Sequence, residues 1–391
     1  MTSVVDHRRD LASALVAAGT VRSPWLRQAF EDTPREGFVP RFYRSVSGHE
    51  VLVDGTDPQQ HQEWLRGVYT DEALTVQLTP APDLAYGSGA PTSSSSMPTV
   101  MAGMLEALDL QPGHRVLEIG TGTGYNAALL CHRVGAHNVV SVELDPSLAD
   151  AARQALADVG LFPAVHAGDG TAGLATAAPF DRIIATAATD HLPPAWISQL
   201  TPGGIIIVDL RGSLAGSLLR LTALDPDIVE GAFQDLPGAF MPMRTRVDSP
   251  HRDGESWDQV FDQRNPQRTT TPVNPGLIAD NPSLRFMAQL HLAGRRLRGF
   301  LRPLSGTELS GRSTDGSWFT ARLHPDNDGL FPVAQGGPRR LWDTIESCYA
   351  LWQRLGEPNA AQFGVTAYDD TALQHVWFDN PDSQYQWPLP L

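Results

Sequence analysis

Residues 116–126 read VLEIGTGTGYN, an apolar run that enters a glycine-rich turn and then a helical pattern. A turn that leaves a buried strand and lays its backbone against a ligand needs positions without a Cβ atom, and Gly120, Gly122 and Gly124 supply them. The backbone can then lie against an adenosyl group. This stretch therefore predicts a nucleotide-like cofactor held between a strand and a helix.

The glycine spacing leaves the identity of the cofactor open, and Glu118 narrows it. The dinucleotide fingerprint is G-x-G-x-x-G, with phosphates at the helix N-terminus, whereas this chain has G-x-G-x-G. A carboxylate beside the turn would repel a pyrophosphate, but it suits a cofactor that carries an ammonium group. We therefore expect S-adenosyl-L-methionine rather than NAD.

Two further acids follow the turn at spacings that one ligand explains. Residues 138–143 form the next apolar run and end in Glu143, which we expect to accept both ribose hydroxyls. Asp169 then stands between two glycines, where it could hydrogen-bond the adenine amino group. Taken alone, a Glu at a strand end is a solvated charge in most proteins, and Asp-Gly is usually a turn. The expected cofactor-binding residues are Glu118, Gly120, Thr121, Gly122, Gly124, Tyr125, Glu143, Asp169 and Gly170.

Apolar runs and helical patterns alternate along this part of the chain. Helical patterns at 127–134 and 147–159 separate the first runs, and further apolar runs lie at 180–186 and 200–208. This alternation predicts an α/β fold with a doubly wound, Rossmann-like parallel sheet. Together with the expected methyl donor, it suggests a sheet of the class I methyltransferase kind.

Length and composition suggest three parts. The chain has 391 residues, too many for one typical domain, and its 41% hydrophobic residues are enough for ordinary cores. We expect an N-terminal helical segment on the substrate side (1–90), a methyltransferase domain (91–225) and an extra C-terminal α+β domain for peptide recognition (226–391). No stretch approaches the roughly twenty apolar residues of a membrane span, and the polar N-terminus lacks a signal-peptide pattern. A cytoplasmic protein without membrane contact is therefore expected.

Charge and cysteine content exclude several classes of function. A formal net charge of −15 argues against a nucleic-acid substrate, because phosphates would be repelled at long range. The two cysteines, Cys131 and Cys348, rule out a disulfide framework or a cysteine-rich metal site, and both are expected in cores. We expect no metal, and zinc, flavin and pyridoxal phosphate have no support in the sequence.

A run of hydroxyl side chains, Thr92 to Ser96, precedes a helical pattern at 100–108. One interpretation is a flexible serine linker that ends in a helix N-cap. The alternative is that hydroxyls and backbone N–H groups beside the methyl donor bind a carboxylate that acts as the nucleophile. A carboxylate is already ionised near neutral pH and needs no general base, so the absence of an obvious His or Cys nucleophile is expected. The candidate catalytic residues are Ser94, Ser95 and Ser96.

These motifs, in this order, resemble those of the protein-L-isoaspartate O-methyltransferase family. The resemblance runs from about Leu15 to Val208, roughly half of the chain. The matching segments are 30–40 (the family's V-P-R-x-x-F-V-P element), 94–98 (T-I-S-x-P), 116–125 (V-L-E-I-G-T-G-S-G-Y), 168–170 (G-D-G), 178–181 (A-P-[FY]-D) and 202–204.

The resemblance implies roles for individual residues. Ser96 matches the family serine that orients the substrate carboxylate, and Ser94 occupies the position of the family threonine. Gly120, Gly122, Glu143 and Asp169 match cofactor residues of the family. Two departures stand out: serines replace the T-I-S sequence, and the region after about Asp225 has no counterpart in the short repair enzyme.

The long C-terminal half favours a dedicated partner over general repair. Residues 225–282 are rich in Pro, Gly and polar residues, which predicts an irregular linker or an elaborated loop region. The helical pattern at 338–355 and the strand patterns at 316–323, 362–367 and 374–379 predict a small α+β module. The layout is similar to family homologues that accompany ribosomally made peptide (RiPP) pathways, including graspetides and lanthipeptides. Such members methylate an aspartate side chain of a precursor peptide, and the neighbouring backbone amide then attacks the ester to give an aspartimide (succinimide), which can hydrolyse to isoaspartate.

Three functions are therefore open. The first is an aspartate O-methyltransferase acting on an already macrocyclised precursor peptide, with a peptide ligase of the same pathway as a further partner. The second is a protein-L-isoaspartate repair methyltransferase. The third is a non-catalytic peptide-binding protein that has kept the methyltransferase fold.

Overall fold

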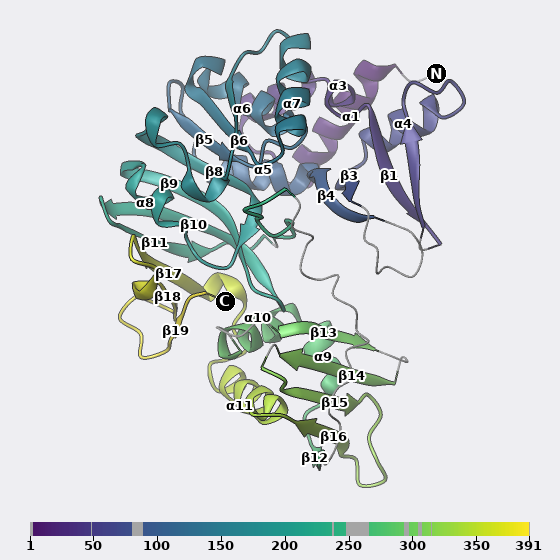
Figure 1. The fold of residues 1–391 in the computed structure, drawn as a ribbon, viewed down its shortest axis with the longest axis vertical. Helices are drawn as coiled ribbons and strands as arrows, with labels where there is room; N and C mark the ends of the chain where they lie inside the picture. The colour runs from purple at the N-terminus through teal and green to yellow at the C-terminus, as the bar shows by residue number, and fades with distance from the viewer. Residues whose placement is uncertain are drawn as a thin grey trace.

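The computed structural model describes residues 3–47, 49–79, 89–236, 238–247, 266–292, 297–303, 307–313 and 315–390 (Figure 1). A ten-stranded sheet forms its centre, a four-stranded sheet and short helices lie beside it at the N-terminal end, and a five-stranded sheet with helices lies beyond it.

The centre of the ten-stranded sheet is parallel and doubly wound, as the sequence predicts. Its parallel strands stand in the order β9-β8-β5-β6-β7. The strands are β5 (Val116–Ile119), β6 (Val139–Glu143), β7 (Ala164–Ala167), β8 (Phe180–Thr189) and β9 (Leu200–Arg211), and the helices between and before them are α5 (Pro98–Ala107), α6 (Tyr125–Val134), α7 (Pro146–Asp158) and α8 (Pro194–Ser198). All residues of β5 and β6 are buried, which explains why these strands read as continuous apolar runs.

Five antiparallel strands extend the same sheet beyond β9. They are β10 (Gly216–Asp225), β11 (Ile228–Phe233), β17 (Phe363–Tyr368), β18 (His375–Phe378) and β19 (Gln386–Pro388). The sequence correctly predicts the strands near 362–367 and 374–379, but assigning them to a separate C-terminal domain is wrong. They complete the methyltransferase sheet because β11 offers them an open edge.

The N-terminal part is not purely helical, contrary to expectation. Its helices are α1 (Val4–Ala17), α2 (Pro24–Asp32), α3 (Arg35–Phe38) and α4 (His61–Val68), and its strands are β1 (Arg41–Val46), β2 (His49–Asp54) and β3 (Leu74–Thr79). With β4 (Ala90–Ser95) they form a sheet in the order β2-β1-β3-β4. The strand β4, which contains most of the serine run, therefore stands at one end of this sheet.

The five-stranded sheet and the helices beside it make up what we call the C-terminal module, residues 267–354. Its strands, in the order β12-β16-β15-β14-β13, are β12 (Gln267–Thr271), β16 (Phe331–Gly336), β15 (Trp318–Arg322), β14 (Glu308–Ser313) and β13 (Leu297–Pro303), and its helices are α9 (Pro275–Asp280), α10 (Pro282–His291) and α11 (Leu341–Arg354). The expected helix near 338–355 and strand near 316–323 are confirmed as α11 and β15. The expected irregular linker at 225–282 is wrong in part, because β11, β12 and α9 lie within it.

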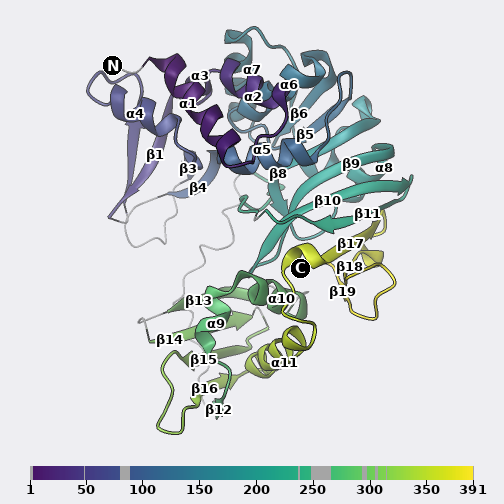
Figure 2. The same cartoon turned by 180° about the vertical axis from the view of Figure 1, so that it is seen from behind.

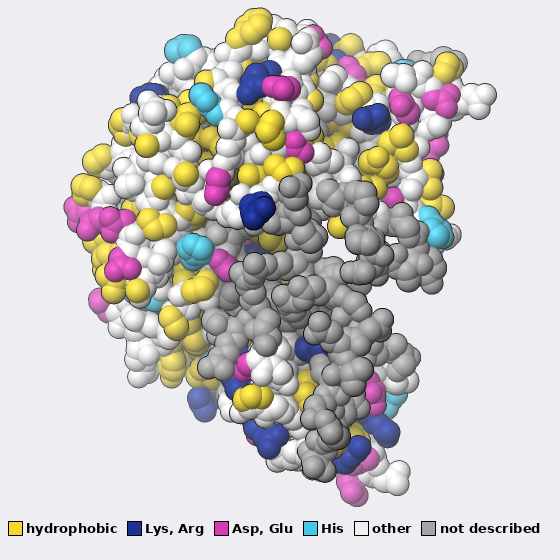
Figure 3. Space-filling model, in the orientation of Figure 1, with side chains coloured by type: hydrophobic (Ala, Val, Ile, Leu, Met, Phe, Trp, Pro, Cys, Tyr) yellow, Lys and Arg dark blue, Asp and Glu magenta, His cyan; other side chains and the backbone are white. Residues whose placement is uncertain are grey.

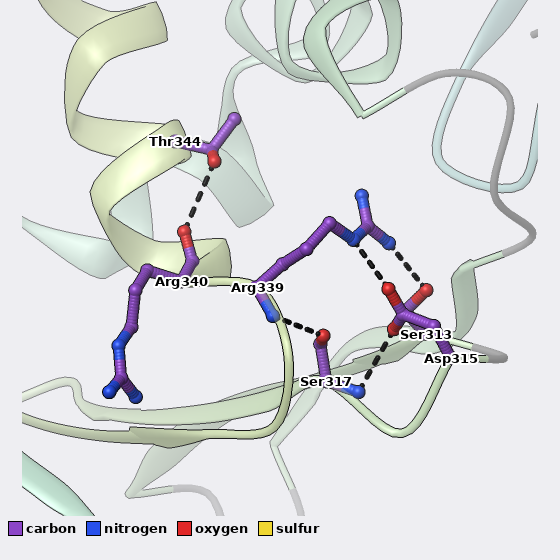
Figure 4. Close-up of polar contacts among 6 residues, drawn as sticks. All are labelled: Ser313, Asp315, Ser317, Arg339, Arg340 and Thr344. Carbon is purple, nitrogen blue, oxygen red and sulfur yellow. Dashed lines mark hydrogen bonds and ion pairs between the residues drawn. The ribbon is translucent and has the colours of Figure 1, made fainter.

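Arg339 fixes the chain where it enters α11 (Figure 4). Its guanidinium donates to Asp315 at 2.6 Å and to the Ser313 hydroxyl at 2.6 Å, while its backbone N–H donates to the Ser317 hydroxyl at 2.9 Å. Burial alone would raise the pKa of Asp315, but the hydrogen bonds from Arg339 and Ser317 hold it well below its usual range. The neighbouring Arg340 points its guanidinium away from this cluster.

The module is joined to the central sheet through α10, seen from behind in Figure 2. Phe286 of α10 lies edge-on to Phe233 and Phe363 of the central sheet, with ring centroids 5.0 and 5.4 Å apart. Gln289, also on α10, accepts a hydrogen bond from the backbone of Leu214 at 2.7 Å. Because these contacts are buried in one shared core, the module and the sheet form a continuous body.

None of the helices in the described part of the chain has the length and apolar character that a bilayer crossing requires. The same residues contain no cluster of three or more His, Cys, Asp or Glu side chains arranged for a metal ion. Both Cys131 and Cys348 are buried, as expected. The sequence contains no lysine, and on the face drawn in Figure 3 the visible Arg side chains are scattered among acidic ones.

Candidate active site

The glycine turn between β5 and α6 has the backbone that the sequence predicts. Gly120, Gly122 and Gly124 have φ angles of 90°, 53° and 87°, in the left-handed region that favours glycine. A Cβ atom on Gly120 would lie 2.9 Å from the Thr186 hydroxyl. A side chain at Gly120 would therefore collide with Thr186, which itself lines the cavity described below.

A cavity of about 220 Å³ lies against this turn, at the carboxyl ends of the parallel strands. This is where open α/β sheets bind their ligands. The expected site residues that line it are Ser94, Ser95, Ser96, Gly120, Thr121, Gly122, Tyr125, Glu143 and Gly170. Glu118, Gly124 and Asp169 do not line it.

Glu143 is placed to hold a ligand with two hydroxyls. One carboxylate oxygen accepts from the backbone of Gly122 at 2.8 Å, and the other accepts from the backbone of Asp145 at 3.1 Å. Each carboxylate oxygen can accept a further hydrogen bond. The carboxylate is therefore fixed at the end of β6 with acceptor capacity left for a ribose.

Glu118 lies behind the cavity wall and does not line the cavity. In this arrangement its carboxylate does not face the space where the cofactor contact is expected. It is fully buried and accepts hydrogen bonds from Asn126, at 2.8 Å, and from Ser141. Burial raises its pKa to about 7. The next residue, Ile119, lines the cavity instead, as the alternation of side chains along a strand leads one to expect.

Asn126, rather than Glu118, lines the cavity beside the glycine turn. Its side-chain N–H group is held by Glu118. Its amide oxygen is buried and has no partner among the described residues. A buried acceptor without a partner suits a ligand that brings N–H donors, as an ammonium group does.

Asp169 stands at the edge of the site. Its carboxylate accepts from the backbone and the hydroxyl of Thr171, at 2.9 and 2.8 Å, and so caps the short helical turn at 170–172. Gly170 lines the cavity, and its carbonyl accepts from the indole N–H of Trp196 at 2.8 Å. The expected contact between Asp169 and an adenine amino group stays a prediction.

The serine run forms a strand, so its interpretation as a flexible linker with a hydroxyl N-cap is wrong. β4 pairs antiparallel with β3, which places Ser94 opposite Thr75 and Ser95 opposite Leu74. Helix α5 follows a cap at Met97 that makes no side-chain hydrogen bond. The carbonyl of Ser94 faces the glycine turn, 3.5 Å from where a Cβ of Gly122 would lie. Hydroxyl groups and the cofactor turn therefore share one cavity.

Arg35, which sequence reasoning did not select, positions the end of the serine strand. It is fully buried. Its guanidinium donates to the carbonyls of Val68, Thr70, Glu72 and Ser96 and to the hydroxyl of Ser95. Burial lowers its pKa. Its place inside the segment at 30–40 that resembles a family motif is the signal that could have identified it.

Residues 238–244, expected to be irregular linker, form another wall of the cavity. All residues from 239 to 244 line it. The backbone of Ala188 donates to Met241 at 2.9 Å and accepts from Met243 at 2.7 Å, and the buried carboxylate of Asp209 accepts from the backbone of Phe240 at 3.0 Å. The apolar sequence Phe240 to Met243 within a polar stretch is the only local signal for this role.

The residues fit S-adenosyl-L-methionine. The glycine turn lines the cavity with its backbone, Glu143 suits a ribose, and the unpartnered amide oxygen of Asn126 suits an ammonium group. Fold and cavity together define a class I, S-adenosylmethionine-dependent methyltransferase, with a row of hydroxyls where the methyl acceptor would lie.

Comparisons with known proteins agree with this class. The family model described as Protein-L-isoaspartate(D-aspartate) O-methyltransferase matches residues 56–222. A relative named Protein-L-isoaspartate O-methyltransferase from Methylorubrum extorquens is 41% identical over 236 residues, covering 60% of this chain and 86% of its own. Protein-L-isoaspartate O-methyltransferase 1 from an Anaeromyxobacter species is 34% identical over 233 residues, covering 59% of this chain and 93% of its own.

The chain belongs to the protein-L-isoaspartate O-methyltransferase family. It is an S-adenosylmethionine-dependent carboxyl O-methyltransferase. A solved structure named protein-L-isoaspartate O-methyltransferase shares the fold at a TM-score of 0.53 and 22% identity, covering 95% of this chain and 100% of its own. Because this likeness in fold extends into the C-terminal half, the length of that half does not by itself separate this chain from the family.

Proposed function

We propose that the protein methylates the free α-carboxylate of L-isoaspartyl residues in peptides or proteins. The observation that carries the proposal is the row of serines along β4, which faces the glycine turn across one cavity. The relatives named for this reaction, which this chain matches over most of their length, support the same acceptor.

The residues of the site would divide the work between two ligands. Bound S-adenosylmethionine supplies an electrophilic methyl group. Glu143 would hold its ribose and Asn126 its ammonium group, while Ser96 and Ser94 would orient the acceptor carboxylate by donating hydrogen bonds to the oxygen that does not attack. The transfer is an in-line displacement, so its rate depends mainly on alignment and on the exclusion of water.

The apolar residues of the cavity support this division. Met97, Val100 and Met101 line the cavity beside the serines, and Phe240 to Met243 line it from the 238–244 segment. A poorly hydrated carboxylate is a stronger nucleophile, because fewer water hydrogen bonds must be broken before it attacks.

A second candidate is methylation of an ordinary aspartate side chain in a dedicated precursor peptide of a RiPP pathway. The resulting ester would close to an aspartimide, because a methyl ester is a better acyl acceptor than a carboxylate. The observation that favours it is the change from T-I-S to Ser94-Ser95-Ser96, since these residues line the acceptor side of the cavity. Under this proposal the partners would be a macrocyclised precursor and a peptide ligase of the same pathway.

A pair of peptides that differ only in one linkage distinguishes the two. Each would be incubated with the protein and S-adenosylmethionine, one with an isoaspartyl and one with an aspartyl residue at the same position. Methyl ester found by mass spectrometry on the isoaspartyl peptide alone supports the first proposal. Ester or aspartimide on the aspartyl peptide alone, with both peptides prepared in macrocyclised form, supports the second. Modification of neither, with the cofactor bound, would overturn both.

A further inference from the structure

Among the described residues, Arg244 is the only cationic side chain that lines the cavity, and Glu143 is the only anionic one. The two lie on different walls, since Glu143 ends β6 and Arg244 ends the 238–244 segment. In a protein with a net charge of −15, an acidic peptide is repelled at long range unless a local cation reverses the field. Arg244 is therefore the candidate for such a contact.

The position of Arg244 is set by the anchored segment that precedes it. The backbone of Met243 donates to Ala188 at 2.7 Å, and that of Phe240 donates to the Asp209 carboxylate at 3.0 Å. Asp209 also accepts from Arg211 at 2.9 Å. Because Ala188 lies on β8 and Asp209 on β9, the backbone that leads to Arg244 is fixed to the central sheet.

The guanidinium of Arg244 has donor groups to spare. It donates to the carbonyl of Thr92 at 3.2 Å and to that of Val247 at 3.0 Å. Both partners are neutral, and no carboxylate among the described residues pairs with it. A guanidinium has five N–H donors, so donors remain for a ligand, and no carboxylate of the described residues neutralises its charge. Arg35, by contrast, is fully buried and bonded to five protein acceptors.

Arg244 and Ser96, the serine proposed to bind the acceptor carboxylate, lie near opposite ends of the serine run. Thr92, which Arg244 contacts, and Ser96 are four positions apart, and a strand rises about 3.3 Å per residue, so the two ends lie roughly 13 Å apart. That is too far for one carboxylate to touch both. It matches the span of about four residues of an extended peptide.

The location of β4 makes an extended acceptor reasonable. Within the described part of the chain, β4 is an end strand of its sheet and pairs with β3 on one side only. Its residues from Thr92 to Ser95, and Ser96 after them, all line the cavity. A peptide lying along this row with its acceptor carboxylate at Ser96 would pass the guanidinium of Arg244 with a residue three or four positions away.

We propose that Arg244 is a specificity-determining residue that binds an acidic side chain of the acceptor peptide, three or four residues from the methylated one. The contact would be a charge-assisted hydrogen bond in a partly buried setting, which strengthens peptide binding and leaves the chemical step unchanged. The inference rests on the proposed carboxyl methylation of peptides.

The test uses the full chain and isoaspartyl peptides that carry Glu or Gln at each position from two to five residues on either side of the acceptor. For the unaltered protein, Glu three or four residues away on one side is expected to lower the KM about tenfold relative to Gln, with little change in kcat. Arg244→Gln should abolish this preference. Arg244→Lys should restore part of it, and Arg244→Glu should instead prefer Lys in the same peptide position.

Arg246→Gln is the matched control, because Arg246 is exposed, lies two residues further on and does not line the cavity. It should keep the preference. If the unaltered protein methylates the peptides with no preference for Glu, the inference fails while the proposed function stands. If Arg244→Gln weakens S-adenosylhomocysteine binding in calorimetry as much as it raises the KM, Arg244 holds the cofactor and the inference is wrong. If no peptide is methylated, the proposed function fails first.

Discussion

The two walls of the cavity are built in different ways. The cofactor wall comes from one continuous stretch, β5, the glycine turn and β6, with Glu143 bonded directly to the turn. The acceptor wall is assembled from β4 and the 238–244 segment. Arg35, which does not line the cavity, positions the end of β4 by a hydrogen bond to the Ser96 carbonyl. Local sequence therefore specifies where the methyl donor lies, whereas long-range packing specifies what receives the methyl group.

The largest expected effect is on the cofactor wall. Gly120→Val should lower activity by more than about 1,000-fold, because a side chain there meets Thr186 and the φ of 90° disfavours any Cβ atom. Calorimetry should show that S-adenosylhomocysteine no longer binds. Gly113→Val is the control, since Gly113 has a φ of 86° with nothing within 4 Å of its Cβ position. Equal loss of binding in both variants would show that only backbone strain matters.

The buried Glu118 should make stability depend on pH. Its pKa is raised by burial from 4.5 to about 7, so the unfolded chain releases its proton at a lower pH than the folded chain does. The contribution of Glu118 to stability is fully present below about pH 4.5 and is lost as the pH rises through about 7, by at most on the order of 3 kcal/mol. Glu118→Gln should remove this part of the pH dependence in denaturant unfolding. A parallel pH profile for both proteins would contradict the assignment.

An intermediate effect is expected at the acceptor wall. Ser96→Ala should lower kcat/KM for the peptide about tenfold to thirtyfold, because a hydrogen bond to the acceptor carboxylate is lost. The affinity for S-adenosylhomocysteine should stay nearly unchanged. Stopped assays at varied peptide concentration and calorimetry measure the two quantities separately. A parallel loss of cofactor affinity would show that the two walls are not separable.

The smallest effect is expected far from the cavity. Arg339→Met removes the bonds to Asp315 and Ser313 at the start of α11, which should lower the free energy of unfolding by about 1–2 kcal/mol. Cofactor affinity should be unaffected. Arg340→Met, which removes the neighbouring charge outside this cluster, should change the melting temperature little. If both variants destabilise the protein equally, the loss of one positive charge, rather than the loss of the hydrogen bonds of Arg339, explains the change in stability.

The sequence predicts the doubly wound sheet and most of the cofactor wall, because the glycines, Glu143 and Gly170 lie within one periodic region. It does not show that Glu118 lies behind the cavity wall, bonded to Asn126 and Ser141, because those contacts form only when β5, β6 and α6 pack together. It misses Arg35 and Arg244, because nothing in the local pattern shows that residues about 60 and 150 positions from the serines reach the same strand. The late strands β17 and β18 are predicted as strands, yet the pairing of β17 with β11 spans more than a hundred residues.

The most direct test of the account is transfer of a labelled methyl group from S-adenosylmethionine to an isoaspartyl peptide by the unaltered protein and by Ser96→Ala. The account predicts a base-labile methyl ester on the isoaspartyl carboxylate, formed much more slowly by the variant at unchanged cofactor affinity. Label on another group, or equal rates for the two proteins, would contradict it.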